Sequence, residues 1–240
     1  MQRNKWPCCV VVVLAVGPVS SRADAPRETV RYVRPAVNKF ETECTFVLTR
    51  QETGWTITST TERGAVKMEV ETRYDAADRP TAARSVLTTD GKTQTATVQV
   101  KDGKATIRRE GHEPAEFDAP QGTIVTSAPD WTDVFLLCRR YDRQRKGKQE
   151  FPALWIHPTQ APRRLTFAIE WQGTNPIEHD GKKTALDRFA IRIRNDSAYM
   201  AWTDAQGRMV RLIPLPYKES APGLTLAGYE KSTAGLLPTP

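Results

Sequence analysis

Few residues of this chain have the types and spacing that metal binding requires. The three histidines are His112, His157 and His179, and no two of them are separated as in an H-x-x-x-H ligand pair. His179 lies directly before a predicted turn at 180–181, which is typical of a solvated turn residue. No cysteine pair has C-x-x-C spacing either. The sequence therefore predicts no metal site and no cofactor.

The sequence also lacks the motifs that are typical of nucleophilic or acid–base catalysis. The chain contains no G-x-S-x-G elbow, which exposes a serine nucleophile on a strained turn, and no glycine-rich phosphate loop. Glu69 and Glu71 are two residues apart on the polar face of a predicted strand, so solvent exposure explains the pair. A glycosidase needs two carboxyls that face one cleft, which this spacing does not indicate. We therefore expect a non-enzymatic protein, and a hydrolase with an unrecognised site is the least favoured alternative.

Two cysteines remain in the main part of the chain, Cys44 and Cys138. In an oxidising compartment such a pair can form one disulfide. Two lone cysteines are also common as small buried apolar groups. The sequence leaves both interpretations open.

A basic run, RRYDRQRKGK, spans residues 139–148. Such a run at the end of a helix is usually a solvated surface that complements the helix dipole. The alternative is contact with anionic lipid head groups, to which each nearby cation contributes about 1 kcal/mol. The candidate residues for contact with an anionic membrane surface are Arg139, Arg140, Arg143, Arg145, Lys146 and Lys148. No nucleic-acid partner is expected, because aromatic residues do not interleave with these charges.

The N-terminus has the features of a secretory signal peptide in their usual order. Two basic residues precede the apolar stretch CCVVVVLAV at 8–16, and small residues lead to the A-x-A site at 23–25. The apolar stretch is much shorter than the roughly 20 residues that span a bilayer. We expect residues 1–25 to be removed, with cleavage after Ala23 or Ala25. The remainder is then exported, periplasmic or extracellular, and soluble.

Size and charge fit one exported domain. The 240-residue chain has a formal net charge of +7, and for an exported protein a modest positive charge is typical of solubility. About 215 residues remain after the signal peptide, which is an ordinary length for one domain. We expect a single β-rich domain over 26–217. A largely flexible tail, containing several Pro and Gly residues, is expected over 218–240.

Most of the chain has the period of two that is typical of half-buried strands. The clearest case is LTFAIEW at 165–171, in which apolar and more polar residues alternate. Asp-Gly pairs at 90–91, 102–103 and 180–181 lie between such runs, and this dipeptide is a strong signal for a tight hairpin. The pattern predicts nine to eleven antiparallel strands that follow one another as a meander.

One segment, from about residue 129 to 145, has helical spacing instead. Its apolar residues are Trp131, Val134, Phe135, Cys138 and Tyr141. Ser127 is placed to cap its start, and Lys146-Gly147 to end it. The apolar stripe needs a partner, and the sheet is the only one available. The sequence therefore predicts a mainly β protein. One long, strongly curved antiparallel sheet, an open half-barrel, carries a single amphipathic helix against its concave face.

Seven aromatic residues are placed to face one interior. They are Trp131, Phe135, Trp155, Phe167, Trp171, Phe189 and Trp202. A core between helix and sheet explains the set. The alternative is that one short helix does not fill a half-barrel of this size, which then keeps an apolar cavity for a lipid or another hydrophobic molecule. We therefore take these residues as candidate ligand contacts.

The last predicted hairpin, AYMAWTDAQGRMVRL at 198–212, has apolar side chains on both faces at 199–202. We expect the helix to cover one face and the C-terminal segment or a neighbouring molecule to cover the other. The hairpin also contains a W-x-D-x-x-G motif, made by Trp202, Asp204 and Gly207.

In its order of signal peptide, long meander, single helix and this motif, the chain resembles the lipoprotein-localisation-factor-like superfamily. More narrowly, it resembles uncharacterised exported bacterial β-proteins grouped near that superfamily. The order of elements resembles that superfamily over residues 28–215, whereas a sequence motif is shared only in the last hairpin. It implies an open barrel that binds acyl chains or other apolar ligands on its concave face. No residue matches the carrier's interaction positions, so lipoprotein transport is not implied.

These observations favour an exported envelope protein that binds a hydrophobic ligand. The main alternative is a structural or interaction module with a filled core, whose strand edges meet a protein partner that the sequence does not identify. An open apolar cavity of a few hundred Å³ between helix and sheet distinguishes the first function from the second.

Overall fold

The structure of the protein, a computed structural model, describes residues 27–37, 40–127, 131–193, 197–218 and 223–237. The expected signal peptide and both of its candidate cleavage sites lie outside the described residues.

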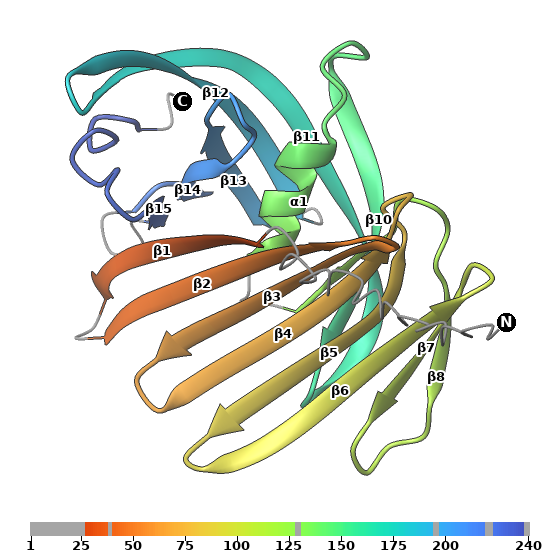
Figure 1. The fold of residues 1–240 in the computed structure, drawn as a ribbon. Coiled ribbons are helices and arrows are strands. Elements are labelled where there is room, and N and C mark those ends of the chain that lie inside the picture. Colours follow the sequence, from red (N-terminus) through yellow and green to blue (C-terminus); the bar gives the residue numbers. More distant parts are fainter. Residues whose placement is uncertain (1–26, 38–39, 128–130, 194–196, 219–222, 238–240) are drawn as a thin grey trace, which may run out of the picture.

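Fifteen strands form one continuous sheet, and one α-helix accompanies them in the described part of the chain (Figure 1). The first eight strands are β1 (Arg27–Val37), β2 (Phe40–Gln51), β3 (Gly54–Arg63), β4 (Val66–Asp75), β5 (Pro80–Thr89), β6 (Lys92–Lys101), β7 (Lys104–Arg109) and β8 (Ala115–Asp118). The remaining elements are β9 (Ile124–Thr126), α1 (Thr132–Arg140), β10 (Lys148–His157), β11 (Gln160–His179), β12 (Lys182–Ile193), β13 (Ser197–Thr203), β14 (Met209–Leu215) and β15 (Leu224–Leu226).

The sheet is a meander at both ends, joined through the C-terminal strand. Its order runs from β8 down to β1, then β15, and from β14 down to β9. The prediction of one large, open, mainly antiparallel sheet with a single helix is confirmed. The predicted strand number is too low, since β8, β9 and β15 are only three or four residues long. Such short strands have no room for a recognisable alternation.

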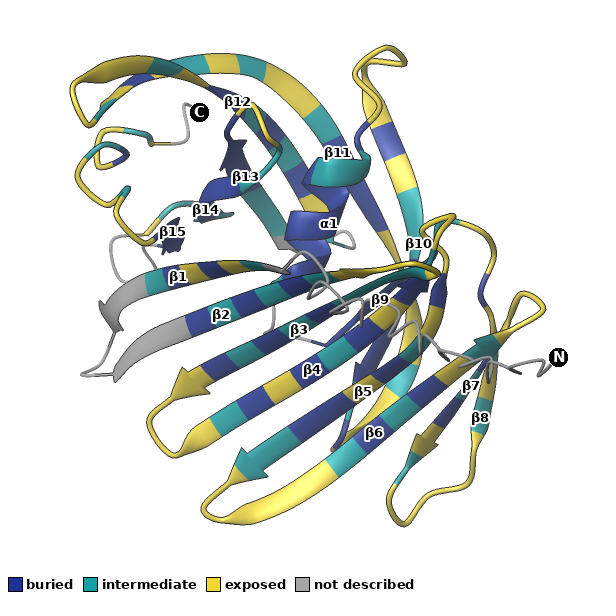
Figure 2. Cartoon of the chain, in the orientation of Figure 1, coloured by how far each residue is buried: buried dark blue, intermediate teal, exposed yellow. Residues whose placement is uncertain are grey.

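Alternating side chains of the N-terminal strands line the concave face. One buried row crosses five strands through Val30, Phe46, Ser59, Val70 and Ser85. The residues between these positions are mostly partly or fully exposed, so buried and exposed bands alternate along the strands (Figure 2). The observed periodicity is the one that the sequence predicts for half-buried strands.

One pair of neighbouring strands departs from the antiparallel prediction. β9 pairs with β10 in parallel, and α1 connects the two. Parallel neighbours need a crossover connection, which is usually a helix. The single helix of the described residues is therefore this crossover.

The β9–β10 edge lies against the other end of the sheet. Val125, Leu154 and Ile156 form a second buried cluster with Val98 of β6 and Ile107 of β7. The neighbouring side chains of the same edge, such as Ala153, belong to the main core with α1. The edge is thus buried on both faces, and the sheet rolls onto itself by side-chain packing rather than closing into a hydrogen-bonded barrel.

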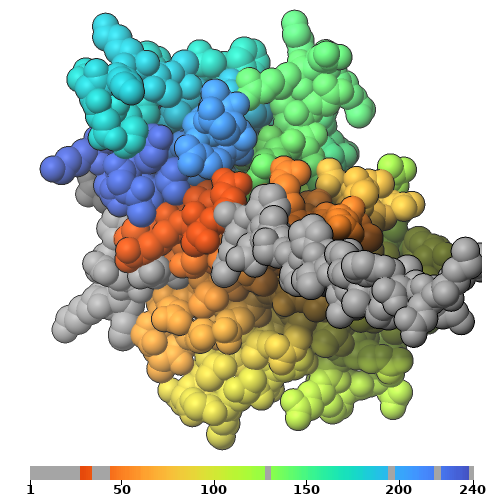
Figure 3. All heavy atoms as spheres, in the orientation of Figure 1, coloured from red at the N-terminus to blue at the C-terminus, as the bar shows by residue number. Residues whose placement is uncertain are grey.

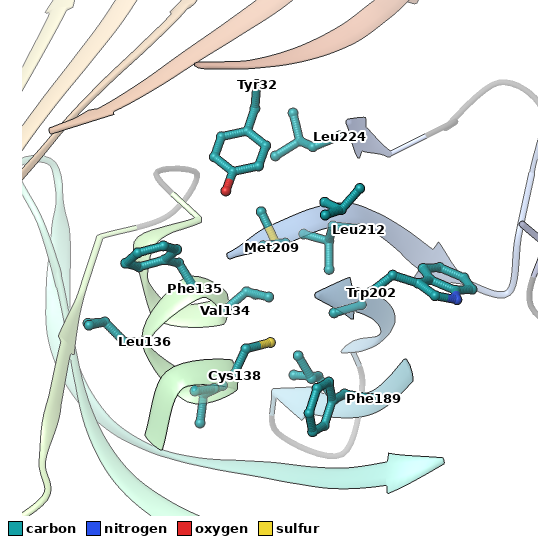
Figure 4. Close-up of a cluster of buried hydrophobic side chains, with 14 of the residues drawn as sticks. Tyr32, Val134, Phe135, Leu136, Cys138, Phe189, Trp202, Met209, Leu212 and Leu224 are labelled. Carbon is teal, nitrogen blue, oxygen red and sulfur yellow. The ribbon is translucent and has the colours of Figure 1, made fainter. Parts of the chain in front are cut away.

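Helix α1 lies inside this curve (Figure 1), and its residues 132–138 are all buried. Figure 4 shows Val134, Phe135 and Cys138 near side chains of β1, β12 and β14. No helix of the described residues has the length and apolarity to cross a membrane.

The helix is shorter than the predicted 129–145. Trp131 precedes its first turn with a left-handed backbone (φ 58°), and Tyr141 is already extended. Ser127 does not act as the cap, because the N-cap position is Trp131; the Ser127 Oγ lies 2.8 Å from Ser85 Oγ instead. The basic run consequently leaves the helix after Arg140 and continues as a turn.

The hairpin at 199–202 is covered on both faces. A bulge between Trp171 and Thr174 interrupts the pairing of β11 with β12, beyond which the long hairpin arches over β13 and β14 (Figure 1). Leu186 of the arch is buried, and Asn175 accepts a hydrogen bond of 2.9 Å from Trp202 Nε1. Figure 4 shows Trp202 pointing away from α1. Helix α1 therefore covers one face of this hairpin, and the arch covers the other.

The C-terminal segment, which the sequence predicts to be largely flexible, makes specific contacts in the structure. Strand β15 pairs with both β1 and β14. Tyr229 stacks on His179 with ring centroids 3.7 Å apart, and buried Arg211 donates hydrogen bonds to Thr233. In the space-filling view the dark blue C-terminal segment lies against the cyan β11–β12 hairpin (Figure 3).

Candidate functional site

A pocket of about 460 Å³ opens between α1 and the β2–β3 turn. This volume is within the range of pockets that hold small ligands, roughly 300–1,000 Å³. Its apolar lining comes from Leu48, Trp55, Phe135 and Leu136. Its polar lining comes from Arg50, Gln51, Glu52, Asp78, Arg139 and Arg140. We call this site the rim pocket.

Local sequence explains how the β2–β3 turn reaches this position. The strands pair to the end of the hairpin, where Gln51 lies opposite Gly54. A Cβ at position 54 would lie 2.0 Å from the carbonyl oxygen of Tyr74, so only glycine permits this approach to β4. The turn therefore brings Trp55 beside Tyr74.

An aromatic stack forms one wall of the rim pocket. The rings of Trp55 and Tyr74 are 4.1 Å apart and nearly parallel, and the Arg140 guanidinium lies 5.4 Å from the Tyr74 centroid. Trp55 Nε1 donates to Asp78 Oδ1 at 2.7 Å. Arg140 donates to the backbone carbonyls of Asp78 and Gly122. These bonds hold the helix end, the β4–β5 turn and the stack in one arrangement.

Arg139, the neighbour of Arg140 in the last turn of α1, also lines the rim pocket and makes fewer hydrogen bonds. Its guanidinium lies 5.1 Å from the Phe135 ring centroid, and its nearest acidic oxygen, Glu28 Oε2, is 3.7 Å away. The Arg139 Nη1 atom is buried and has no hydrogen-bond partner among the described residues. A methyl group on Gly207 would lie 3.8 Å from Arg139 Cγ, so the β13–β14 turn packs beside the stem of this side chain.

The chemical character of the rim pocket follows from the side chains that line it. Among the described residues this lining contains no histidine, cysteine or serine, and both of its acids lie at exposed positions. No group of three metal-ligating side chains occurs anywhere in the described ranges. The arrangement offers an apolar surface beside hydrogen-bond donors of positive charge.

The predicted ligand-binding aromatics do not gather at one site. Phe167, Phe189 and Trp202 are fully buried in the main core, and of the predicted set only Phe135 also lines the rim pocket. Phe135 belongs to both because α1 lies between the core and the pocket.

The remaining predicted aromatics lie outside the rim pocket, although Trp131 packs against the main core. Trp171 is 43% exposed, and its Nε1 donates to Asp187, so the expectation that it faces the interior is wrong. The bulge that follows Trp171 places it at the margin of the sheet. Trp155 is buried between His157 and Arg163, and Trp131 packs edge-on against Tyr199.

The basic side chains of the run at 139–148 lie in different parts of the structure. Arg139 and Arg140 line the rim pocket, Arg143 pairs with Asp187, and Lys148 pairs with Glu150 at 2.6 Å. Arg145 and Lys146 are exposed in the turn after the helix. The six cations therefore do not form one surface.

Both cysteines are buried thiols, and no disulfide joins them. Cys44 Sγ lies 3.3 Å from Thr61 Oγ1. Burial raises the pKa of the Cys138 thiol to about 12. A thiol that stays protonated is a poor nucleophile, so Cys138 is a packing residue here.

Sequence reasoning missed Leu48, Trp55 and Leu136 as pocket residues. The pattern places Trp55 at the start of a strand after the 53–54 turn, but it does not show which element faces that turn. The site depends on the contact of α1 with β2 and β3, which are separated from it by about 80 residues of chain.

Comparisons with known proteins show the fold. No family model and no curated protein sequence matches the chain. A crystal structure described as a β-barrel-like protein of domain of unknown function DUF1849, from Brucella abortus, is similar with a TM-score of 0.52 and 11% sequence identity. The match covers 83% of this chain and 96% of that chain. At this identity the likeness supports a β-barrel-like fold alone.

A second structure, a DUF1089 family protein from Pseudomonas aeruginosa, matches with a TM-score of 0.43 and 14% identity. That match covers 91% of this chain and 97% of the other. It adds no further argument.

Proposed function

We propose that this protein is an exported, non-enzymatic protein of the cell envelope that binds a lipid or another hydrophobic ligand. The observation that carries the proposal is the rim pocket. It has the volume of a small-ligand site and an apolar floor of Leu48, Phe135 and Leu136. The N-terminal sequence supports export, and the resemblance to open half-barrel carriers agrees with an apolar ligand.

The position of the ligand differs from the one expected from the sequence. The concave face is occupied by α1 and the main core, in which Phe167 and Phe189 are buried. The ligand instead binds at the margin of that core, where the helix end leaves the sheet. Its apolar body contacts Phe135 and Trp55.

The proposal also assigns a place to the exposed cations. Arg145 and Lys146 project from the turn after α1, and an anionic membrane surface is the partner that such charges suit. An envelope protein that collects or releases a lipid would approach that surface.

Native mass spectrometry of the exported protein, with organic extraction of bound molecules, tests the proposal. We expect an apolar molecule to co-purify near a one-to-one ratio. Trp55→Ala removes a wall of the rim pocket and should lower the retained ligand. Trp171→Ala, which removes the same side chain outside the pocket, should not. A ligand-free mass that stays unchanged after incubation with fatty acids and phospholipids would overturn the proposal.

A further inference from the structure

Arg139 is the pocket residue whose polar groups are least satisfied. A guanidinium carries five N–H donors, yet Nη1 is buried without a hydrogen-bond partner among the described residues. Glu28 Oε2, at 3.7 Å, is close enough for charge attraction but beyond hydrogen-bond distance. A buried donor without an acceptor is costly, and more so when it carries charge. The site therefore lacks an acceptor.

The side chain is also held in place. Its guanidinium lies over the Phe135 ring, and its stem packs beside Gly207. Only 26% of the side chain is exposed. Because Arg139 is ordered before a ligand arrives, little conformational entropy remains to be lost on binding.

The neighbouring charges leave Arg139 as the available donor. Both terminal nitrogens of Arg140 already donate to backbone carbonyls. Asp78 accepts from the Trp55 indole, and Glu52 is exposed on the turn. The carboxyl end of α1 adds a partial negative charge of about one half. That is less than the full charge that each pocket arginine contributes.

We propose that the ligand of the rim pocket carries an anionic head group, a carboxylate or a phosphate, and that Arg139 binds it. The inference rests on the proposed binding of an apolar ligand and names the chemical class of that ligand. Carboxylate and phosphate oxygens are the acceptors that match the fork of a guanidinium. Phe135 contacts both Arg139 and the pocket, so a head group at Arg139 places the apolar body on Phe135 and Leu136.

The same geometry assigns a role to Glu28. Its carboxylate attracts Arg139 in the unliganded protein and competes with the incoming anion. Glu28→Gln removes this competition while keeping the shape of the side chain. It should therefore strengthen the binding of an anionic amphiphile, whereas Arg139→Gln should weaken it.

Calorimetric titration with three probes of equal chain length tests the inference. Dodecanoate and dodecyl phosphate carry the two anionic head groups, and dodecanol is the neutral control. We expect the exported protein to bind at least one anionic probe about tenfold or more tightly than dodecanol, as a charged hydrogen bond implies. The stronger anionic probe identifies the head group.

Variants then locate the effect. Arg139→Gln should reduce binding of the anionic probe to the level of dodecanol. Arg108→Gln, which removes the same charge from an exposed position of β7 outside the pocket, should leave the preference unchanged. Circular dichroism of each variant checks that it is folded, and Glu28→Gln provides a test that does not depend on Arg139→Gln folding.

The outcomes separate the two proposals. Equal binding of all three probes would overturn the anionic head group and leave apolar binding intact. An anionic preference that survives Arg139→Gln would overturn the role of Arg139. Binding of none of the probes would overturn the proposed function, and this inference with it.

Discussion

At the scale of single residues, burial determines which ionisable groups are chemically available. Asp133, in the first turn of α1, is buried, and its carboxylate accepts hydrogen bonds from Thr126 Oγ1 at 3.0 Å and from the Val134 amide at 2.7 Å. Desolvation nevertheless raises the pKa of Asp133 above its ordinary value of 3.8. The two hydrogen bonds only partly offset the loss of water around the charge.

This pKa shift has a consequence for stability. Because the pKa of Asp133 is higher in the folded protein than in the unfolded chain, the folded protein holds the proton more tightly. The stability that the protonated carboxyl contributes is therefore fully present below about pH 3.8. It is lost as pH rises through the folded pKa. Asp133→Asn should therefore gain stability relative to the unsubstituted protein as pH rises above 4, by up to about 1.4 kcal/mol per pH unit across the titration. Urea denaturation of both proteins at several pH values measures this, and a difference independent of pH would contradict it.

The cysteines give a second prediction at this scale. Both thiols are buried, and the raised pKa of Cys138 keeps it protonated at neutral pH. We expect alkylation of both residues to be slow in the folded protein and fast in urea. Mass spectrometry of the labelled protein reads this directly. Rapid labelling without urea, or a mass lower by two hydrogens, would contradict the thiol assignment.

At the scale of elements, the decisive feature is the arch made by the β11–β12 hairpin. β11 is 20 residues long, and the bulge after Trp171 turns its distal half over β13 and β14. Leu186 is consequently fully buried, although it lies near a hairpin end. The alternation at 165–171 predicts the strand, but no residue pattern shows where the strand folds back.

Substitution of Leu186 tests whether the arch contributes to the core. Leu186→Ala should lower the free energy of unfolding by about 2–5 kcal/mol, as for other buried leucines. Lys183→Ala, on the exposed part of the same hairpin, should leave stability unchanged. Equal stability of the two variants in urea would show that the arch is not packed on the sheet.

At the scale of the whole molecule, the rolled sheet is closed by apolar packing. Leu154 and Ile156 pack against β6 and β7. Asp118 of β8 also pairs with Arg164 of β11 at 2.8 Å, but both side chains are more than half exposed. Exposed ion pairs contribute little, because water and salt screen them.

A pair of variants tests whether the apolar packing or the ion pair holds the two ends of the sheet together. Leu154→Ala should lower the free energy of unfolding by about 2–5 kcal/mol. Asp118→Ala should leave the urea midpoint nearly unchanged. A larger loss from Asp118→Ala than from Leu154→Ala would mean that the ion pair, and not the second core, holds the two ends together.

The sequence predicts local structure well and long-range contacts poorly, for physical reasons. Periodicity reveals the strands and the position of α1. Apolar side chains that face the core recur at every second residue in a strand and at every third or fourth residue in a helix. The end of α1 at Arg140 depends on the extended backbone of Tyr141, which the apolar pattern does not encode. The rim pocket was not predictable, because it joins Leu136 to Leu48 across more than a third of the chain.

The most direct test of ligand binding in the rim pocket is photo-cross-linking with a diazirine-bearing fatty acid, followed by peptide mapping. Binding in this pocket predicts labels on peptides that contain residues 48–55 and 135–140. Competition by dodecanoate should remove them. Labels confined to other strands, or labelling that dodecanoate does not reduce, would contradict a ligand site between α1 and the β2–β3 turn.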